Sequence, residues 1–132
     1  MLEPKQFEVN EAWVAFRLNR MPIRTQADGD FDCIALMDAA SCFILASDLL
    51  PLADAKSEPL ALRRLFSKAK SHKQTFPKTL FVPQGDAAEV LVAEAKRQNI
   101  QVVSVPEREV LMLIGEAREG FAERFEGRGD DA

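Results

Sequence analysis

Apolar and polar positions along the chain alternate in blocks short enough to be single strands and helices. Residues 33–37 and 42–46 form two apolar runs, and the short link 38–41 separates them. Each run is about the length of a strand, and a link this short brings the second strand back antiparallel beside the first. Both runs are almost continuously apolar rather than alternating. We therefore predict a β-hairpin that is covered on both faces.

Three further stretches have the length and composition of strands. Residues 11–18, 79–83 and 100–105 are rich in β-branched and aromatic side chains. Residues 21–30 include a proline and a glycine and are predicted to form a loop. The chain is thus expected to contain five strands.

Apolar residues at helical spacing predict three helices in the second half of the chain. Ser57 and Glu58 favour a helix start, and the first helix carries one apolar stripe made of Leu62, Leu65, Phe66 and Ala69. Asp86 precedes a glutamate by three residues, which predicts a capping box at the start of the second helix. The third helix is expected to follow Pro106 and to extend to residue 125.

The order of these elements predicts an α/β domain with a mixed sheet. The first three strands are expected to form an antiparallel meander, and the last two to join by helical crossovers, which favour parallel pairing. The three helices then lie on the two faces of the five-stranded sheet. This domain covers residues 11–125, between an N-terminal arm at 1–10 and a polar tail at 126–132. The expected core consists of Ile34, Leu36, Phe43, Leu45, Leu65, Phe66, Phe81, Leu91, Val102, Leu113 and Ile114.

Composition narrows the classes of function. The 132 residues carry a net charge of −4, which argues against a dedicated nucleic-acid binder. A basic and then apolar leader and an apolar run of about 18 residues are both lacking, so a cytoplasmic protein without a membrane segment is expected. His72 is the only histidine, so little material exists for a histidine triad or a zinc site. Cys33 and Cys42 are offset along the hairpin and are expected to be free thiols.

The ordered set of motifs resembles the catalytic cores of retroviral integrases and transposases, which have the ribonuclease H-like fold. The segments that carry the resemblance are NEAWVAFRLNRMPIRT, DFDCIALMDAASCFILASDLL and FPKTLFVPQGDAAEVLVAEAKRQNIQVVSVP. In that family a tryptophan opens the first strand, as Trp13 does here, and a later strand ends in Asp-x-x-Ser, as at Asp38 and Ser41. The resemblance covers roughly residues 10 to 125 and implies the same fold.

The departures from the family concern its catalytic carboxylates. By the resemblance, the aspartate of the first strand falls on Phe16 and that of the fourth strand falls on Pro83. The glutamate of the last helix falls on Glu119, which an ordinary solvated helix face also explains. Phenylalanine and proline offer no ligand to Mg²⁺, which requires oxygen atoms. The resemblance therefore implies a relative with a vestigial site and no catalytic residue, metal or cofactor.

Three functions stay open at this point. The first is a non-catalytic interaction or scaffold module with a protein partner not identified by the sequence, in which a homodimer is one arrangement. The second is a metal-dependent nuclease whose ligands have moved to Asp38, Asp86 and Glu119, although the first two are also explained as a turn former and a helix cap. The third is a nucleic-acid binder without chemistry, through a basic cluster that contains Arg63, Arg64, Lys68, Lys70, His72, Lys73 and Lys78.

Overall fold

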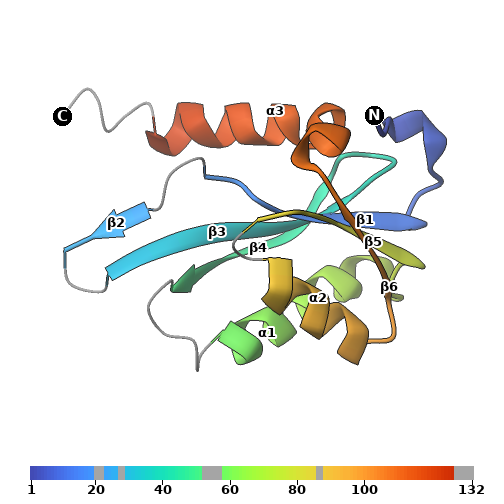
Figure 1. Cartoon of the computed structure of the whole chain (residues 1–132), viewed down its shortest axis with the longest axis horizontal. Coiled ribbons are helices and arrows are strands. Elements are labelled where there is room, and N and C mark those ends of the chain that lie inside the picture. The colour runs from blue at the N-terminus through green and yellow to red at the C-terminus, as the bar shows by residue number, and fades with distance from the viewer. Residues whose placement is uncertain (20–22, 27–28, 52–57, 86–87, 127–132) are drawn as a thin grey trace.

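The computed structural model has three layers, with a mixed β-sheet between helices (Figure 1). It describes residues 1–19, 23–26, 29–51, 58–85 and 88–126. The strands are β1 (Ala12–Arg17), β2 (Ile23–Thr25), β3 (Gly29–Asp38), β4 (Ile44–Pro51), β5 (Thr79–Pro83) and β6 (Gln101–Val105). The helices are α1 (Glu58–Lys73), α2 (Ala88–Arg97) and α3 (Leu111–Phe121), with 3₁₀ helices at Pro4–Gln6 and Glu107–Val110 and a π-helical turn at Ala122–Glu126.

The sheet has the connectivity that the order of elements predicted. Its order is β2-β3-β1-β5-β6, and β4 pairs with the other side of β3. The pairs β1–β3 and β3–β4 are antiparallel, whereas β1–β5 and β5–β6 are parallel. In Figure 1, α3 lies over one face of the sheet, and α1 and α2 lie over the other. The α/β class, the mixed sheet and the three helices on its faces are therefore confirmed.

In the described part of the chain the sheet has six strands rather than the predicted five, because part of the predicted loop at 21–30 is a strand. Residues 23–25 form β2, and Gly29 opens β3 with a φ of +83°. Ile23 pairs with Phe31, and Thr25 pairs with Gly29. The first residues of β3 are polar and were therefore assigned to the loop, but their backbone extends the hairpin all the same.

The second strand of the predicted hairpin also begins later than expected. β4 starts at Ile44 rather than at Cys42, because Cys42 has a φ of +58° and belongs to the turn. Phe43 consequently leaves the sheet, and its side chain is 55% exposed. Its assignment to the core was wrong. Phe81 and Val102 are half-buried, and the other residues of the predicted core are buried.

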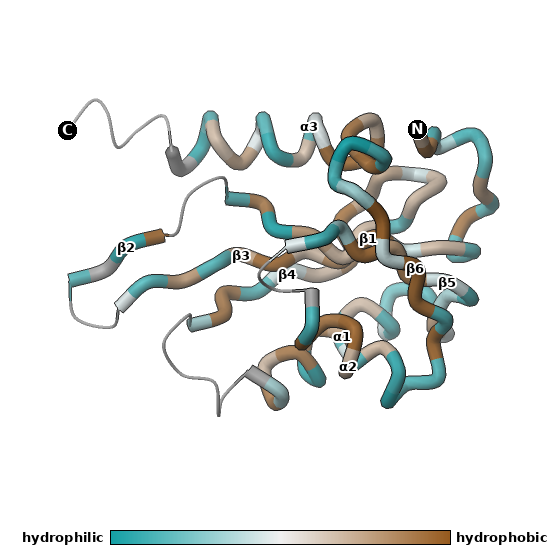
Figure 2. The backbone as a smooth tube through the Cα atoms, viewed as in Figure 1, coloured by the Kyte–Doolittle hydropathy of each residue, from teal (hydrophilic) through white to brown (hydrophobic). Residues whose placement is uncertain are grey.

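The core is divided into two clusters by the sheet, because successive side chains of a strand point to opposite faces. Ile34 and Leu36 of β3 pack with Trp13 and with α1 and α2, whereas Ala35 and Met37 pack on the side of α3. In Figure 2 most of β6 and parts of β3 and β4 are apolar, and α3 alternates between hydrophilic and more apolar turns. The strands are thus continuously apolar because helices cover both faces of the sheet.

The predicted starts of the first two helices, at Ser57 and Asp86, lie outside the described residues. No helix within the described ranges is both long and apolar enough to cross a membrane.

Candidate functional site

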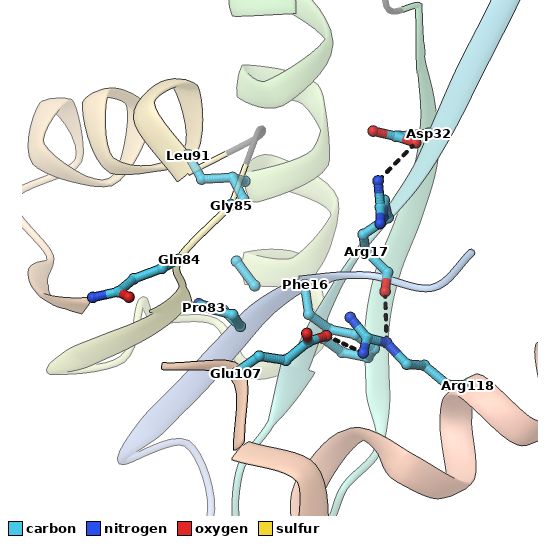
Figure 3. Close-up of a pocket in the computed structure, with 10 residues that line it drawn as sticks. Phe16, Arg17, Asp32, Pro83, Gln84, Gly85, Leu91, Glu107 and Arg118 are labelled. Carbon is cyan, nitrogen blue, oxygen red and sulfur yellow. Dashed lines mark hydrogen bonds and ion pairs between the residues drawn. The ribbon is translucent and has the colours of Figure 1, made fainter. Parts of the chain in front are cut away.

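A cavity of about 170 Å³ opens where β1 and β5 end side by side (Figure 3). These neighbouring strands run parallel, with Val14 opposite Phe81, so Phe16 and Pro83 each lie two residues beyond that pair. Both residues line the cavity. Its lining is Ala15, Phe16, Arg17, Asp32, Pro83, Gln84, Gly85, Leu91, Glu107 and Arg118.

Phe16 and Pro83 give the cavity an apolar wall at the two strand positions where the resemblance expects carboxylates. Phe16 is 2% exposed, because it packs in the core cluster beneath α3. Pro83 is half-buried at the last position of β5. The geometry thus brings two of the three vestigial positions together and leaves neither with an oxygen ligand on its side chain.

Helix α3 directs Arg118, and not Glu119, into this cavity. The Nε of Arg118 donates a hydrogen bond of 2.9 Å to the carbonyl oxygen of Arg17, and its guanidinium forms an ion pair with Glu107 (Figure 3). Arg118 follows the buried Ile114 by four residues, which places both on one side of the helix. Glu119 is one residue further round, is exposed and does not line the cavity. No motif of the sequence indicated Arg118, although its spacing of four residues from Ile114 was a usable signal.

The second acidic group of the cavity is Asp32, which is also engaged. Its side chain is 5% exposed, and one carboxylate oxygen, Oδ1, accepts a hydrogen bond of 2.9 Å from Nδ2 of Asn19. The guanidinium of Arg17 lies 3.8 Å from the same oxygen. Asn19 in turn accepts a 2.7 Å hydrogen bond from the backbone N–H of Cys33. Asn19 and Asp32 form a buried polar pair that no sequence motif indicated.

Among the described residues, the cavity contains equal numbers of cationic side chains and carboxylates. Arg17 and Arg118 face Asp32 and Glu107, and each carboxylate has an arginine as its ion-pair partner. A divalent cation at these carboxylates would therefore have to share them with the guanidinium groups. In the part of the chain that the structure describes, no three His, Cys, Asp or Glu side chains are placed to hold a metal ion together.

Asp38 lies at the other end of β1 from the cavity, because it pairs with Trp13 whereas Phe16 pairs with Ala35. Its carboxylate is buried and accepts hydrogen bonds from the N–H of Asn10 at 2.7 Å and from the N–H and hydroxyl of Ser41 at 2.9 and 2.7 Å. These contacts close the turn before β4. The structure therefore does not bring Asp38 near Glu119, and Asp86 lies outside the described residues.

The basic cluster is separate from the cavity. Most of its side chains project from α1, on the sheet face opposite α3, and none of them lines the cavity. Within the described ranges none of these cations forms an ion pair with a carboxylate, although Nζ of Lys70 lies 4.8 Å from the ring centroid of Phe76. Exposed members are Arg63, Arg64, Lys68, Lys70, His72 and Lys78, and Lys73 is half-buried.

The two cysteines are free thiols, as expected. Burial raises the pKa of Cys33 from its ordinary 9.0 to about 11, and the carboxylates of Asp48 and Asp32 add to the effect. Burial also raises the pKa of Cys42, with smaller contributions from Glu116 and Asp38. Both groups are protonated at neutral pH, so neither is an activated nucleophile.

Comparison with solved structures finds similarity to retroviral integrase catalytic cores at low sequence identity. The HTLV-2 integrase catalytic core domain, solved with magnesium in a dimeric form, is 13% identical with a TM-score of 0.49, and the match covers 86% of this chain and 84% of that one. A chain of the simian T-cell lymphotropic virus intasome, solved by cryo-EM in complex with PP2A regulatory subunit B56 gamma, is 10% identical with a TM-score of 0.45.

The second match covers 95% of this chain and 44% of the other, so this chain spans less than half of that protein's length. No family model matches the sequence, and no curated protein matches it. Similarity at these identities and scores carries no information about activity. The order and directions of the strands are themselves those of the ribonuclease H-like fold that the sequence resembles.

Proposed function

We propose that this chain is a ribonuclease H-like domain without catalysis, which acts as an interaction or scaffold module. The observation that carries the proposal is the composition of the cavity at the ends of β1 and β5. Its wall holds Phe16 and Pro83 where the resemblance places two carboxylates, and α3 supplies Arg118. A site that held two divalent metals would need several carboxylate oxygens converging on this point.

The electrostatics of the cavity support the same proposal. A Mg²⁺ ion gives up its hydration water reluctantly and takes one or two carboxylates in exchange. Here the available carboxylates, Asp32 and Glu107, are bound to Arg17 and Arg118. The cationic side chains repel a metal ion and compete for its ligands, so this cavity is better suited to holding the two strand ends and α3 together than to chemistry.

A nuclease with displaced ligands is the alternative from another functional class, and metal binding distinguishes the two. We expect equal melting temperatures with millimolar Mn²⁺ and with a chelator, and no cleavage of DNA, RNA or their hybrid with either Mg²⁺ or Mn²⁺. A ligand present at about 100 times its dissociation constant stabilises the folded state by about 2.7 kcal/mol, which for a domain of this size is roughly 10 °C.

The contrary result would be a rise of that size with Mn²⁺ that disappears in Glu119→Ala. Such a result, together with metal-dependent cleavage, would replace the interaction module by the nuclease. Glu116→Ala serves as the matched control on the same helix, because it removes an exposed carboxylate that does not line the cavity.

A further inference from the structure

Among the described residues, strand β4 forms an open edge of the sheet. It is eight residues long, and within the described ranges its only strand partner is β3. Helix α1 packs over one face of β4. An edge strand leaves every second residue with an unpaired N–H and C=O, and such a row of groups is a template for pairing with another chain.

The hydrogen bonds of Cys33 identify which residues of β4 face the open edge. The carbonyl of Cys33 accepts from the N–H of Leu18, just beyond β1, and its N–H donates to Asn19. Cys33 thus uses its backbone groups on the β1 side. Leu49, which lies opposite Cys33 on β4, is therefore in a pair without mutual hydrogen bonds. The backbone groups of Leu49 point away from β3.

Asp48 gives independent evidence for this direction. Its Oδ1 accepts a hydrogen bond of 2.8 Å from the N–H of Leu49, which a bond to β3 would preclude. Ser47, two residues earlier, has the same orientation, and Pro51, two residues later, lacks an N–H on the open side. The open edge consequently presents the N–H and C=O of Ser47 and Leu49. The row of donors ends at Pro51, which has no N–H.

A row of cations accompanies this edge on the side of α1. Arg64, Lys68 and His72 are spaced by four residues, lie on one flank of the helix and are exposed. The ring of His72 contacts that of Phe43, which directly precedes β4, with centroids 6.0 Å apart. This contact places the flank with His72 beside the start of β4. Arg64 and Lys68 have no ion-pair partner among the described residues.

The opposite flank of α1 carries equivalent cations that face elsewhere. Lys70 lies over the ring of Phe76, and Phe76 packs edge-on against Trp13 of the central strand β1. Arg63 precedes Lys70 by seven residues, which is about two helical turns, and is also exposed. The two flanks therefore have similar charge but different neighbours.

We infer that the open edge of β4 and the row Arg64, Lys68 and His72 bind an extended acidic segment of a partner protein, which adds to the sheet as a further strand. The backbone groups of Ser47 and Leu49 would bind the backbone of the segment, and a carbonyl of the segment would replace Asp48 at the N–H of Leu49. Side chains of a strand alternate between the two faces. Acidic residues on one face would meet the cations of α1, while apolar residues on the other would meet Leu49, which is 48% exposed.

This inference names the partner class of the proposed interaction module and so rests on that proposal. The test uses a synthetic peptide of about eight residues in which glutamate and valine alternate, titrated into the ¹⁵N-labelled full chain. We expect saturable shifts centred on the amides of Ser47 and Leu49, and slower hydrogen exchange at both. A peptide in which lysine replaces glutamate should not bind.

Matched charge reversals distinguish binding at this site from a general electrostatic attraction of the peptide to the protein. The double variant Arg64→Glu and Lys68→Glu should weaken binding of the acidic peptide about tenfold or more, while Arg63→Glu with Lys70→Glu, which has the same net charge, should change it less than twofold. All four positions are exposed, so both variants are expected to fold. An equal loss in the two variants would overturn the inference.

Other results would also overturn it. Two concern the peptide titration: the absence of saturable binding, and chemical-shift changes located away from β4. Two concern other partners: tighter binding of oligothymidylate than of the peptide by the same cations, and self-association through β4 detected by sedimentation. Metal-dependent nuclease activity would instead overturn the proposed function without moving the amides of β4, so the two failures are distinguishable.

Discussion

Replacement of Asp38 by alanine should be among the most damaging single changes outside the apolar core. The carboxylate is buried and accepts three hydrogen bonds, from the N–H of Asn10 and from the N–H and hydroxyl of Ser41. Without it, two backbone donors lose their partner, and each unsatisfied donor costs about 1–3 kcal/mol. The hydroxyl of Ser41 can turn to water. We expect a loss of about 4 kcal/mol in the free energy of unfolding.

The same change reaches the central strand through Asn10. Oδ1 of Asn10 accepts a 2.6 Å hydrogen bond from Nε1 of Trp13, and its Nδ2 donates to Thr75. Trp13 is the only tryptophan and is fully buried, so its fluorescence reports both on global unfolding in urea and on this local network. The slope of the urea transition should stay constant, since the surface exposed on unfolding does not change.

Asp38→Asn tests whether the hydrogen bonds or the mere volume of the side chain matter. Asparagine keeps one acceptor oxygen but directs an amide NH₂ at a second donor, so we expect a loss of about half that of alanine. Ser41→Ala, which removes only the hydroxyl, should cost about 1 kcal/mol. A loss below about 1 kcal/mol for Asp38→Ala, or an equal loss for alanine and asparagine, would refute the reasoning.

Three further predictions concern the core, a thiol and the cavity. Leu65→Ala should destabilise the protein by about 3 kcal/mol in urea unfolding, whereas Phe43→Ala, at an exposed aromatic residue, should cost less than about 1 kcal/mol. Because the pKa of Cys33 is raised to about 11, the unfolded state loses its thiol proton first as the pH rises above 9. Stability should therefore fall between pH 9 and 11, and less so in Cys33→Val. Arg118→Met should destabilise by about 1 kcal/mol, and a double-mutant cycle with Glu107→Gln should give a coupling below about 1 kcal/mol, since Glu107 is about half exposed.

The sheet and helices were predictable from the sequence because their apolar periodicities are local. β2 was not, since its three residues and the polar start of β3 become strands only by pairing with each other. The length of the turn before β4 was equally hidden. Cys42 adopts a left-handed conformation that non-glycine residues seldom take, held by the contacts of Asp38, and this conformation moves Phe43 out of the core.

The position of the candidate site was partly predictable, and its chemistry was not. Parallel pairing of β1 with β5 brings Phe16 and Pro83 to one cavity, as the resemblance implied. The resemblance placed the third position on Glu119, but α3 puts Arg118 in the cavity, because a shift of one residue rotates a side chain by about 100° around the helix. The pair Asn19 and Asp32 depends on two segments that meet only in the folded chain.

The parallel contact between β1 and β5 also determines when the protein can complete its sheet during synthesis. Thr79 pairs with Ala12 but follows it by 67 residues (79 − 12). At about 5–20 residues per second, a ribosome needs roughly 3 to 13 seconds to make that interval. Meanwhile β3 can already pair with β4 and with β1. The strand whose edge stays open for this time is thus β1, the most buried strand of the finished domain, and a nascent chain that stalls before residue 79 should expose it to chaperones.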